Sequence, residues 1–248
     1  MASPTRSQRL SPEETAERAD RILEAAGLLL VSWGHRKVTI EDVARRAGVG
    51  KGTVYLHFPT KEVLFLVVIM RAQVDLGRAL LADMAVRPEA ILPHSLARSL
   101  LLEMERSPIL HALFTRDTEV LGTVVDTAAD DRTSLLRERT KSMESYFLLL
   151  GEEGLVRPDL SPQELLHAYG SIITGFLFRP LLLEQQDQRV LDRQRQSRLL
   201  ADSVRRTLEE PHSEQELHSA WPKITALIDH LVGRAHAALN HYRTTRRD

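Results

Sequence analysis

The stretch from Val38 to Lys61 constrains the fold of this chain most, because its capping and turn residues leave room only for short helices. Thr39 is a typical N-cap residue, and Asp42 follows three residues later, where the partner of a capping box stands. Gly48 tolerates a positive φ, so it ends the first short helix and turns the chain. Pro59 ends the second, because the residue before a proline is steered away from helical dihedrals. The pattern predicts two short helices joined by a glycine turn and followed by a third helix.

Two short helices joined in this way form a helix-turn-helix, whose second helix can lie in the major groove of DNA. That helix is expected to start near Lys51, and Gly52 in its first turn lets the backbone approach DNA closely. Contacts to base edges are expected from Lys51 and Thr53, with Leu56 as an apolar neighbour for a thymine methyl group. Phosphate contacts, which position the helix without reading sequence, are expected from Thr39, Tyr55, His57 and Lys61.

This block resembles the DNA-binding domain of TetR-family transcriptional regulators over roughly residues 16 to 65. The matching residues are Thr39, Ile40, Val43, Ala44, Ala47-Gly48-Val49, Lys51-Gly52-Thr53-Val54-Tyr55, His57-Phe58 and Lys61-Glu62-Leu64. Gly50 departs from the family pattern, which most often has a serine there, but glycine is still an acceptable N-cap. The resemblance implies a sequence-specific regulator of transcription. It therefore favours DNA contact over a merely solvated helix face for Thr53, Tyr55 and His57.

Charge is distributed unevenly along the chain, whose formal net charge is only −1. Between Gly34 and Lys61 the basic residues outnumber the acidic ones, Glu41 and Asp42; they are Arg36, Lys37, Arg45, Arg46, Lys51 and Lys61. A locally basic segment suits a surface that faces phosphates. The absence of cysteine excludes disulfides, thiolate catalysis and cysteine zinc sites. Because no run is long and apolar enough for a membrane span and no signal peptide is present, we expect a cytoplasmic protein without membrane contact.

The whole chain is predicted to be all-α, because apolar residues recur three and four apart and no stretch alternates like a strand. The expected helices outside the short pair are 12–33, 61–86, Glu89–Arg106, Pro108–Arg116, Glu119–Gly151, Pro162–Leu183, Asp187–Glu209 and Pro222–Tyr242. We expect a flexible N-terminal segment (1–11), a helix-turn-helix DNA-binding domain (12–61) and a helical effector-binding and dimerisation domain (62–248).

The resemblance also implies a homodimer that binds a near-palindromic double-stranded operator, and a small-molecule effector. The helix Pro162–Leu183 contains Gly170 and Gly175, which close approach of another helix would justify. We expect the dimer interface to combine this helix with one of the two later helices. Candidate effector contacts are polar or aromatic residues within apolar stretches, namely His111, Phe114, Tyr146, Tyr169, Thr174 and Phe178. The alternative for each is a core or interface residue whose polar tip is satisfied.

Metal binding and catalysis are not expected. His230, His236 and His241 are spaced by six and five residues, which does not place them together on one helical face. Tyr169-Gly170-Ser171-Ile172 is not a nucleophile elbow, and no glycine loop could cradle phosphate, so we expect no cofactor. We expect a dimeric repressor released from its operator by an effector. Alternatives are an activator or a ligand-independent repressor of the same fold, or a helical adaptor or enzyme without specific DNA binding.

Overall fold

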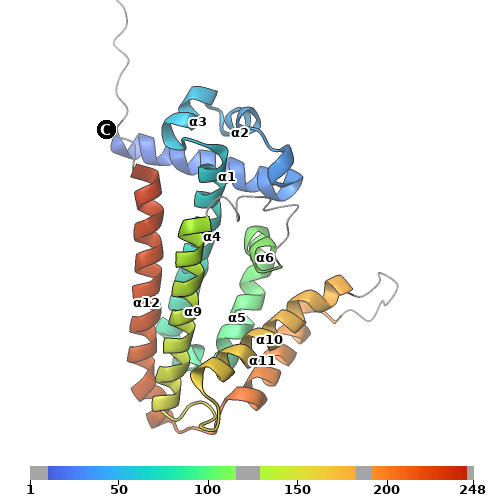
Figure 1. The fold of residues 1–248 in the computed structure, drawn as a ribbon, viewed down its shortest axis with the longest axis vertical. Helices are drawn as coiled ribbons and strands as arrows, with labels where there is room; N and C mark the ends of the chain where they lie inside the picture. Colours follow the sequence, from blue (N-terminus) through green and yellow to red (C-terminus); the bar gives the residue numbers. More distant parts are fainter. Residues whose placement is uncertain (1–10, 116–128, 183–190, 245–248) are drawn as a thin grey trace, which may run out of the picture.

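A computed structural model describes residues 11–115, 129–182 and 191–244 of the chain (Figure 1). All regular elements within these ranges are helices, and the nearest approach to a sheet is an isolated bridge between Val156 and Glu209. The prediction of an all-α fold is confirmed.

The helices, labelled as in Figure 1, are α1 Pro12–Lys37, α2 Ile40–Ala47, α3 Lys51–His57, α4 Lys61–Val86, the 3₁₀ turn η1 Pro88–Ile91, α5 Pro93–Arg106, α6 Pro108–Thr115, α9 Ala129–Glu152, α10 Pro162–Leu182, α11 Arg193–Leu208 and α12 Glu214–Thr244. Helices α1, α2 and α3 form one end of the molecule. Helix α12 runs along the body beside α4 and α9, while α10 and α11 lie side by side at the other end (Figure 1).

The first helix follows its predicted start and stop signals. Ser11 Oγ accepts a hydrogen bond from the Glu14 backbone, and the Glu14 carboxylate accepts one from the Ser11 backbone, which makes a capping box. Gly34 has a φ of 74° and breaks the helical path, after which one more turn reaches Lys37. Trp33, the last residue of the expected helix 12–33, is 47% exposed.

The expected single helix Glu89–Arg106 is divided in the structure. Leu92 is extended, with a ψ of 147°, because it precedes Pro93, and α5 begins at that proline. The 3₁₀ turn η1 covers the part before Leu92.

The start predicted for the last helix, Pro222, is wrong. The helix begins at Glu214, because Ser213 and Glu216 form a capping box there, and Pro222 lies inside α12. A second late helix is shorter than expected: α11 starts at Arg193, where the Asp192 carboxylate accepts a hydrogen bond from the Arg195 backbone. The expected helical residues 119–128, 183 and 187–190, and all but one residue of the expected flexible segment, lie outside the described ranges.

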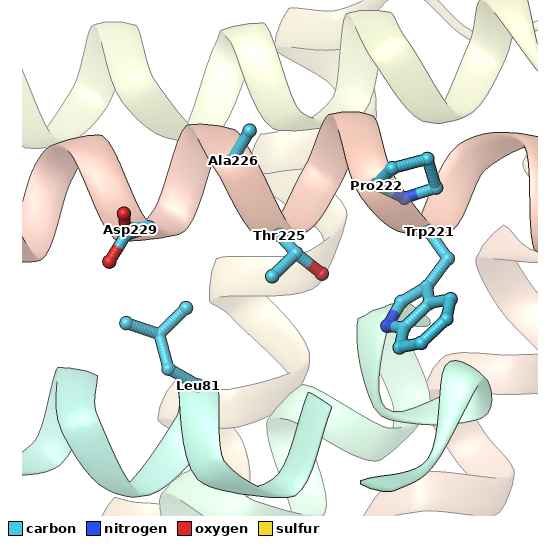
Figure 2. Close-up of a pocket in the computed structure, with 6 residues that line it drawn as sticks. All are labelled: Leu81, Trp221, Pro222, Thr225, Ala226 and Asp229. Carbon is cyan, nitrogen blue, oxygen red and sulfur yellow. The ribbon is translucent and has the colours of Figure 1, made fainter. Parts of the chain in front are cut away.

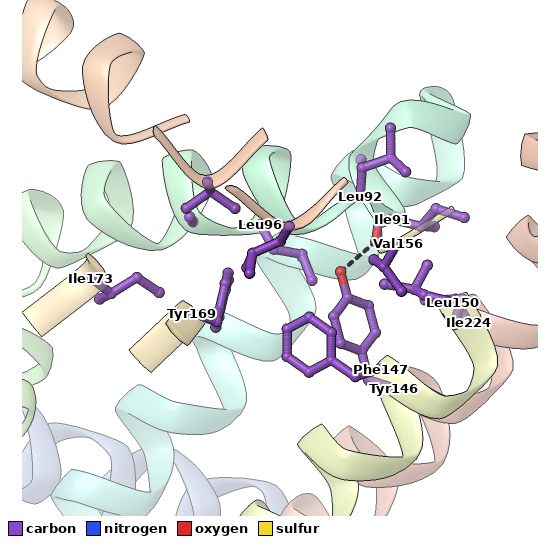
Figure 3. Packing of buried hydrophobic residues seen from close by; sticks show 14 of the residues in the cluster. Ile91, Leu92, Leu96, Tyr146, Phe147, Leu150, Val156, Tyr169, Ile173 and Ile224 are labelled. Carbon is purple, nitrogen blue, oxygen red and sulfur yellow. Dashed lines mark hydrogen bonds between the residues drawn. The ribbon is translucent and has the colours of Figure 1, made fainter. Parts of the chain in front are cut away.

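Two hydrophobic cores lie along the molecule. The first joins α1, α2, α3 and the first half of α4 as far as Val74, and it also includes Ala112 from α6 and Leu239 from α12. The second is built around the aromatic residues Tyr146 and Phe147 (Figure 3). Because Leu239 belongs to the first core and the earlier turns of α12 to the second, the last helix is anchored in both cores.

A buried polar contact joins α5 to the end of α11. The Glu209 carboxylate accepts hydrogen bonds from the His94 backbone (2.7 Å) and from His94 Nδ1 (2.8 Å). Arg205 Nη2 lies 2.6 Å from His94 Nε2, and because arginine can only donate, Nε2 is the acceptor. Through these contacts His94 links the inner face of α11 to α5.

Candidate nucleic-acid interface

The turn between α2 and α3 has the geometry that its sequence predicts. Thr39 caps α2 by accepting a hydrogen bond from the Asp42 backbone, and Asp42 closes the capping box. Gly48 is left-handed, with φ 67°, and the Val49 N–H reaches back to the Ala44 carbonyl at 3.0 Å. Three residues separate the end of α2 at Ala47 from the start of α3 at Lys51. This is a helix-turn-helix.

Helix α3 is fixed by its inner face and leaves its outer face open. Val54 and Phe58 are completely buried in the first core. On the opposite side Lys51, Gly52 and Tyr55 are exposed. Leu56 is 80% exposed, so this large apolar side chain contributes little to the stability of the single chain. An exposed leucine between polar residues on this helix suits contact with a partner.

The glycine in the first turn of α3 is not required by packing within the protein. A Cβ added to Gly52 would meet no atom of the described residues within 4 Å. Its φ is not in the left-handed range either, whereas Gly48 needs that conformation. Glycine inside a helix is unfavourable by about 1 kcal/mol relative to alanine. Gly52 therefore leaves room for the close approach of a molecule outside the chain.

Lys51, a predicted base-reading residue, has two partners in the free protein. Its ammonium forms an ion pair with the Glu41 carboxylate of α2 and lies 5.8 Å from the centre of the Tyr55 ring. The hydrogen bond with Glu41 raises the pKa of Lys51 and lowers that of Glu41. DNA contact by Lys51 therefore requires an exchange of the carboxylate for a phosphate or a base edge. The two partners are ten positions apart, and nothing in the sequence signals this pairing.

The remaining predicted DNA contacts lie around the same two helices and the start of α4. Thr39 is exposed, but its hydroxyl already donates to the Asp42 carboxylate at 2.6 Å. Thr53 and His57 are half-buried, and the His57 ring lies against Phe58. Lys61 stands in the first turn of α4, where Thr60 caps the helix by accepting a hydrogen bond from the backbone of Val63.

A buried histidine lies behind Lys61. The His35 ring packs edge-on against Phe65, with 5.3 Å between ring centres, and its Nε2 is buried without a hydrogen-bond partner among the described residues. Burial lowers the pKa of His35; the charge of Lys61 lowers it further, and Glu62 partly opposes this shift. Burial also lowers the pKa of Lys61. A phosphate near the start of α4 would favour the charged form of Lys61.

The predicted effector contacts lie at different depths in the described part of the chain. Tyr146 is fully buried and its hydroxyl donates to the Ile91 carbonyl at 2.7 Å (Figure 3). Burial raises the pKa of this phenol well above its usual value, so it remains a donor. Tyr169 packs edge-on against Phe147 in the same core. Thr174 is exposed on α10, and the other three, His111, Phe114 and Phe178, are half-buried.

Among the described residues, a groove lies between α4 and α12, and none of the predicted effector contacts lines it. Its lining residues are Leu81, Trp221, Pro222, Thr225, Ala226 and Asp229 (Figure 2). Sequence reasoning missed it because the start of α12 was placed at Pro222, and the pairing of α12 with α4 joins residues more than a hundred positions apart. Among the described residues, no group of histidine, aspartate and glutamate is arranged to hold a metal ion. No described helix has an apolar stretch that could cross a membrane.

Comparison with known proteins points to the same region. The family model described as "Bacterial regulatory proteins, tetR family" matches residues 22–68. YhgD, an uncharacterised HTH-type transcriptional regulator of Bacillus subtilis, is 26% identical over 148 residues, which are 59% of this chain and 73% of that protein. MT1294, an uncharacterised HTH-type transcriptional regulator of Mycobacterium tuberculosis, is 30% identical over 115 residues, 46% of this chain and 56% of that protein.

The complete fold is also similar to that of solved structures. The complex of SmeT with triclosan aligns with a TM-score of 0.59 at 19% identity, over 78% of this chain and 92% of that chain. SmeT is the repressor of the multidrug efflux pump SmeDEF of Stenotrophomonas maltophilia. At this identity the likeness shows a shared fold. Together with the curated regulators, the family model and the helix-turn-helix at α2 and α3 identify residues 22–68 as a helix-turn-helix region of the kind found in bacterial regulatory proteins of the TetR family.

Proposed function

We propose that the protein is a dimeric repressor that binds a near-palindromic operator through α3 and leaves it when a small-molecule effector binds. The observation that carries the DNA-binding part is the outer face of α3. There an exposed leucine, Leu56, and an unconstrained glycine, Gly52, stand among polar side chains, although neither contributes to packing within the chain. A helix face of this kind fits the major groove.

In the proposed complex the first turn of α3 enters the groove first. Lys51 and Thr53 read base edges there, and Leu56 meets a thymine methyl group. Tyr55, His57, Lys61 and Thr39 hold phosphates on either side and set the orientation of the helix. The segment 12–61 would then be the DNA-binding domain, and 62–248 would hold the dimer interface and the effector site. Because the operator is genomic DNA, we place the protein in the cytoplasm.

The dimer interface is proposed on α10 and α11. Helix α12 packs along α4 and α9 of its own chain, whereas α11 packs beside α10 and has an exposed outer face, so we choose α11 as the second helix of the interface. On α10 the residues Ser171, Thr174 and Gly175 are exposed, and a Cβ added to Gly170 or Gly175 would meet no described atom within 4 Å. A second helix could approach this face closely, and two recognition helices would then lie roughly 34–36 Å apart or more on the operator.

Thr174→Arg tests the interface. A long charged side chain on that face should convert the dimer to a monomer in sedimentation equilibrium, and operator affinity should fall by a factor on the order of 10² because the two half-sites are no longer linked. Lys141→Arg, on an exposed turn of α9, is the matched control. A Thr174→Arg protein that remains dimeric would contradict this interface.

Repression and effector release are proposed by analogy. SmeT, whose fold this chain shares, is an efflux-pump repressor and has been solved with triclosan. An effector can lower operator affinity only if it prefers a state in which the two recognition helices are wrongly placed. No catalytic role is proposed for any residue.

The decisive experiment is selection of bound fragments from genomic DNA, followed by anisotropy titration of the enriched fragment at several salt concentrations. We expect one near-palindromic sequence, a steep loss of affinity with salt, and strong weakening by Tyr55→Ala and Lys61→Ala but not by Lys141→Ala. Weak binding without any enriched sequence would contradict the proposal and favour an adaptor. An operator that raises transcription from a neighbouring promoter would replace repression with activation.

A further inference from the structure

Helices α4 and α12 come into unusually close contact at one point. The γ-methyl group of Val232 occupies the space in which a Cβ of Gly77 would stand, so no larger residue fits at Gly77 without movement of α12. The contact joins the two helices, α4 and α12, that connect the two cores. Helix α4 leads directly from α3, and α12 carries Leu239 into the first core.

The groove between the same two helices, about 430 Å³ in volume, begins one turn away from this contact. Leu81 follows Gly77 by four residues on α4, and Asp229 precedes Val232 by three on α12. In Figure 2 Leu81 faces Thr225 and Asp229 across the space between the helices, and Trp221 and Pro222 close the other end. Trp221 is fixed there, because its Nε1 donates to the Met84 carbonyl at 2.8 Å.

Two polar groups in the groove lack partners. Asp229 is exposed, and among the described residues it takes part in no ion pair. The Thr225 hydroxyl is buried and has no hydrogen-bond partner within the described part of the chain. The rest of the lining is apolar or aromatic: Leu81, Trp221, Pro222 and Ala226. A buried hydroxyl without a partner is unfavourable by about 1–3 kcal/mol, so a ligand that offers it a hydrogen bond would relieve this cost.

We propose that this groove binds an amphipathic organic cation. Its ammonium group would pair with Asp229, its apolar or aromatic body would cover Leu81 and Trp221, and a polar atom next to the body would meet the Thr225 hydroxyl as the groove opens. A carboxylate without a partner favours a cation, and the apolar lining favours a hydrophobic body over a hydrated metal ion.

Occupancy of the groove acts on DNA binding, a consequence that rests on the proposed function. A ligand between Leu81 and Thr225 separates α4 from α12 and opposes the close contact of Gly77 with Val232. Because Leu239 lies in the first core together with residues of α1, α2, α3 and α4, movement of α12 relative to α4 shifts the DNA-binding helices. The ligand therefore binds the separated state more tightly and lowers operator affinity.

The binding step can be tested without DNA. The probe is 4-phenylbutylamine, which is cationic at neutral pH, and its matched analogues are 4-phenylbutanol and 4-phenylbutyrate. Fluorescence of Trp221 is followed in full-length protein carrying Trp33→Phe, so that the signal comes from the groove. We expect saturable binding of the amine, binding of the alcohol and the carboxylate at least about tenfold weaker, and an equal loss for the amine in Asp229→Asn. Glu24→Gln removes an exposed carboxylate on α1 and should change nothing.

Equal binding of amine and alcohol, an unchanged affinity in Asp229→Asn, or no saturable signal would overturn the proposed site. The coupling is then measured on the selected operator, where the amine should weaken DNA binding by wild-type protein and not by Asp229→Asn. Binding in the groove without any effect on DNA affinity would overturn the coupling alone. Loss of operator binding altogether, with fluorescence titrations intact, would instead count against the proposed function.

Discussion

At the scale of single residues, substitution of Gly52 should lower operator affinity without lowering the stability of the fold. Alanine in its place adds a methyl group that meets no described atom, and it should raise or leave unchanged the free energy of unfolding, by up to about 1 kcal/mol. The same methyl group stands where the backbone must approach DNA, so operator affinity should fall. Urea unfolding and anisotropy titration measure the two effects. A Gly52→Ala protein that binds the operator as tightly as wild type would show that α3 does not approach DNA at this turn.

A substitution of Glu41 is expected to raise operator affinity rather than lower it. Its carboxylate pairs with Lys51 in the free protein, and both side chains are exposed. Glu41→Gln frees the ammonium for DNA and removes a negative charge beside the phosphates, so operator affinity should rise by a few-fold at low salt. The gain should shrink as salt screens exposed charges. The matched control is Glu24→Gln on α1. Equal gains in operator affinity in both variants would show that the effect comes from net charge and not from the release of Lys51.

His35 makes the DNA-binding end sensitive to acid. Its pKa in the folded protein lies below the ordinary value of 6.5, with burial as the main cause and the Lys61 charge as the second. Above that value both folded and unfolded chains hold a neutral ring, and the stability is complete. As the pH falls through about 6.5 the unfolded chain takes up a proton first, so stability is lost towards the folded-state pKa.

His35→Phe keeps an aromatic ring against Phe65 and removes the titrating group. The loss of urea stability between about pH 7.5 and about pH 5.5 should be smaller in this variant than in wild type. His230→Phe, at an exposed position on α12, should retain the full loss. An unchanged pH dependence in His35→Phe would assign the acid sensitivity to other groups.

At the scale of helices, local chemistry made the DNA-binding end predictable. One capping box, one left-handed glycine and one proline define α2 and α3, and each acts within a few residues. Burial of Val54 and exposure of Tyr55 also follow from helical spacing. The ion pair of Lys51 with Glu41 could not be predicted in the same way, because it depends on how two helices are placed in space.

The surroundings of the candidate effector residues were harder to predict from the sequence, for a related reason. Tyr146 and Tyr169 stand within apolar stretches whether they line a cavity or fill a core, and the structure places both in the second core. Pro222 predicts a helix start at that position unless the capping box of Ser213 with Glu216 is recognised as the true start. The groove arises only when α12 packs on α4, a pairing of helices far apart in sequence.

The contact of α4 with α12 supplies a prediction at this scale. Gly77→Ala places a methyl group against Val232 and should separate the two helices, so operator affinity should fall in the absence of any ligand. Val232→Ala alone leaves a small cavity and should be destabilised by about 1–3 kcal/mol. In the double variant the two changes should compensate, and operator affinity should recover. If affinity in the double variant stays at the level of Gly77→Ala, helix separation is not the cause.

At the scale of the whole molecule, the two hydrophobic cores are connected by two long helices, α4 and α12. Helix α12 is packed in the second core near its start and in the first core at Leu239, while α4 joins the cores from within (Figure 1). A change at the groove thus reaches the DNA-binding end through two packed connections. In the proposed dimer the outer faces of α10 and α11 pack against a second copy of the chain, and this contact would set the spacing of the two α3 helices.

A hydroxyl-radical footprint of the purified protein on its selected operator tests this arrangement most directly. Two equivalent protected regions, related by the symmetry of the sequence and separated by roughly one helical turn of DNA or a multiple of it, are predicted. Gly52→Ala should weaken both regions equally. A single protected region, or uniform protection that does not follow the sequence, would contradict a dimer that reads DNA through α3.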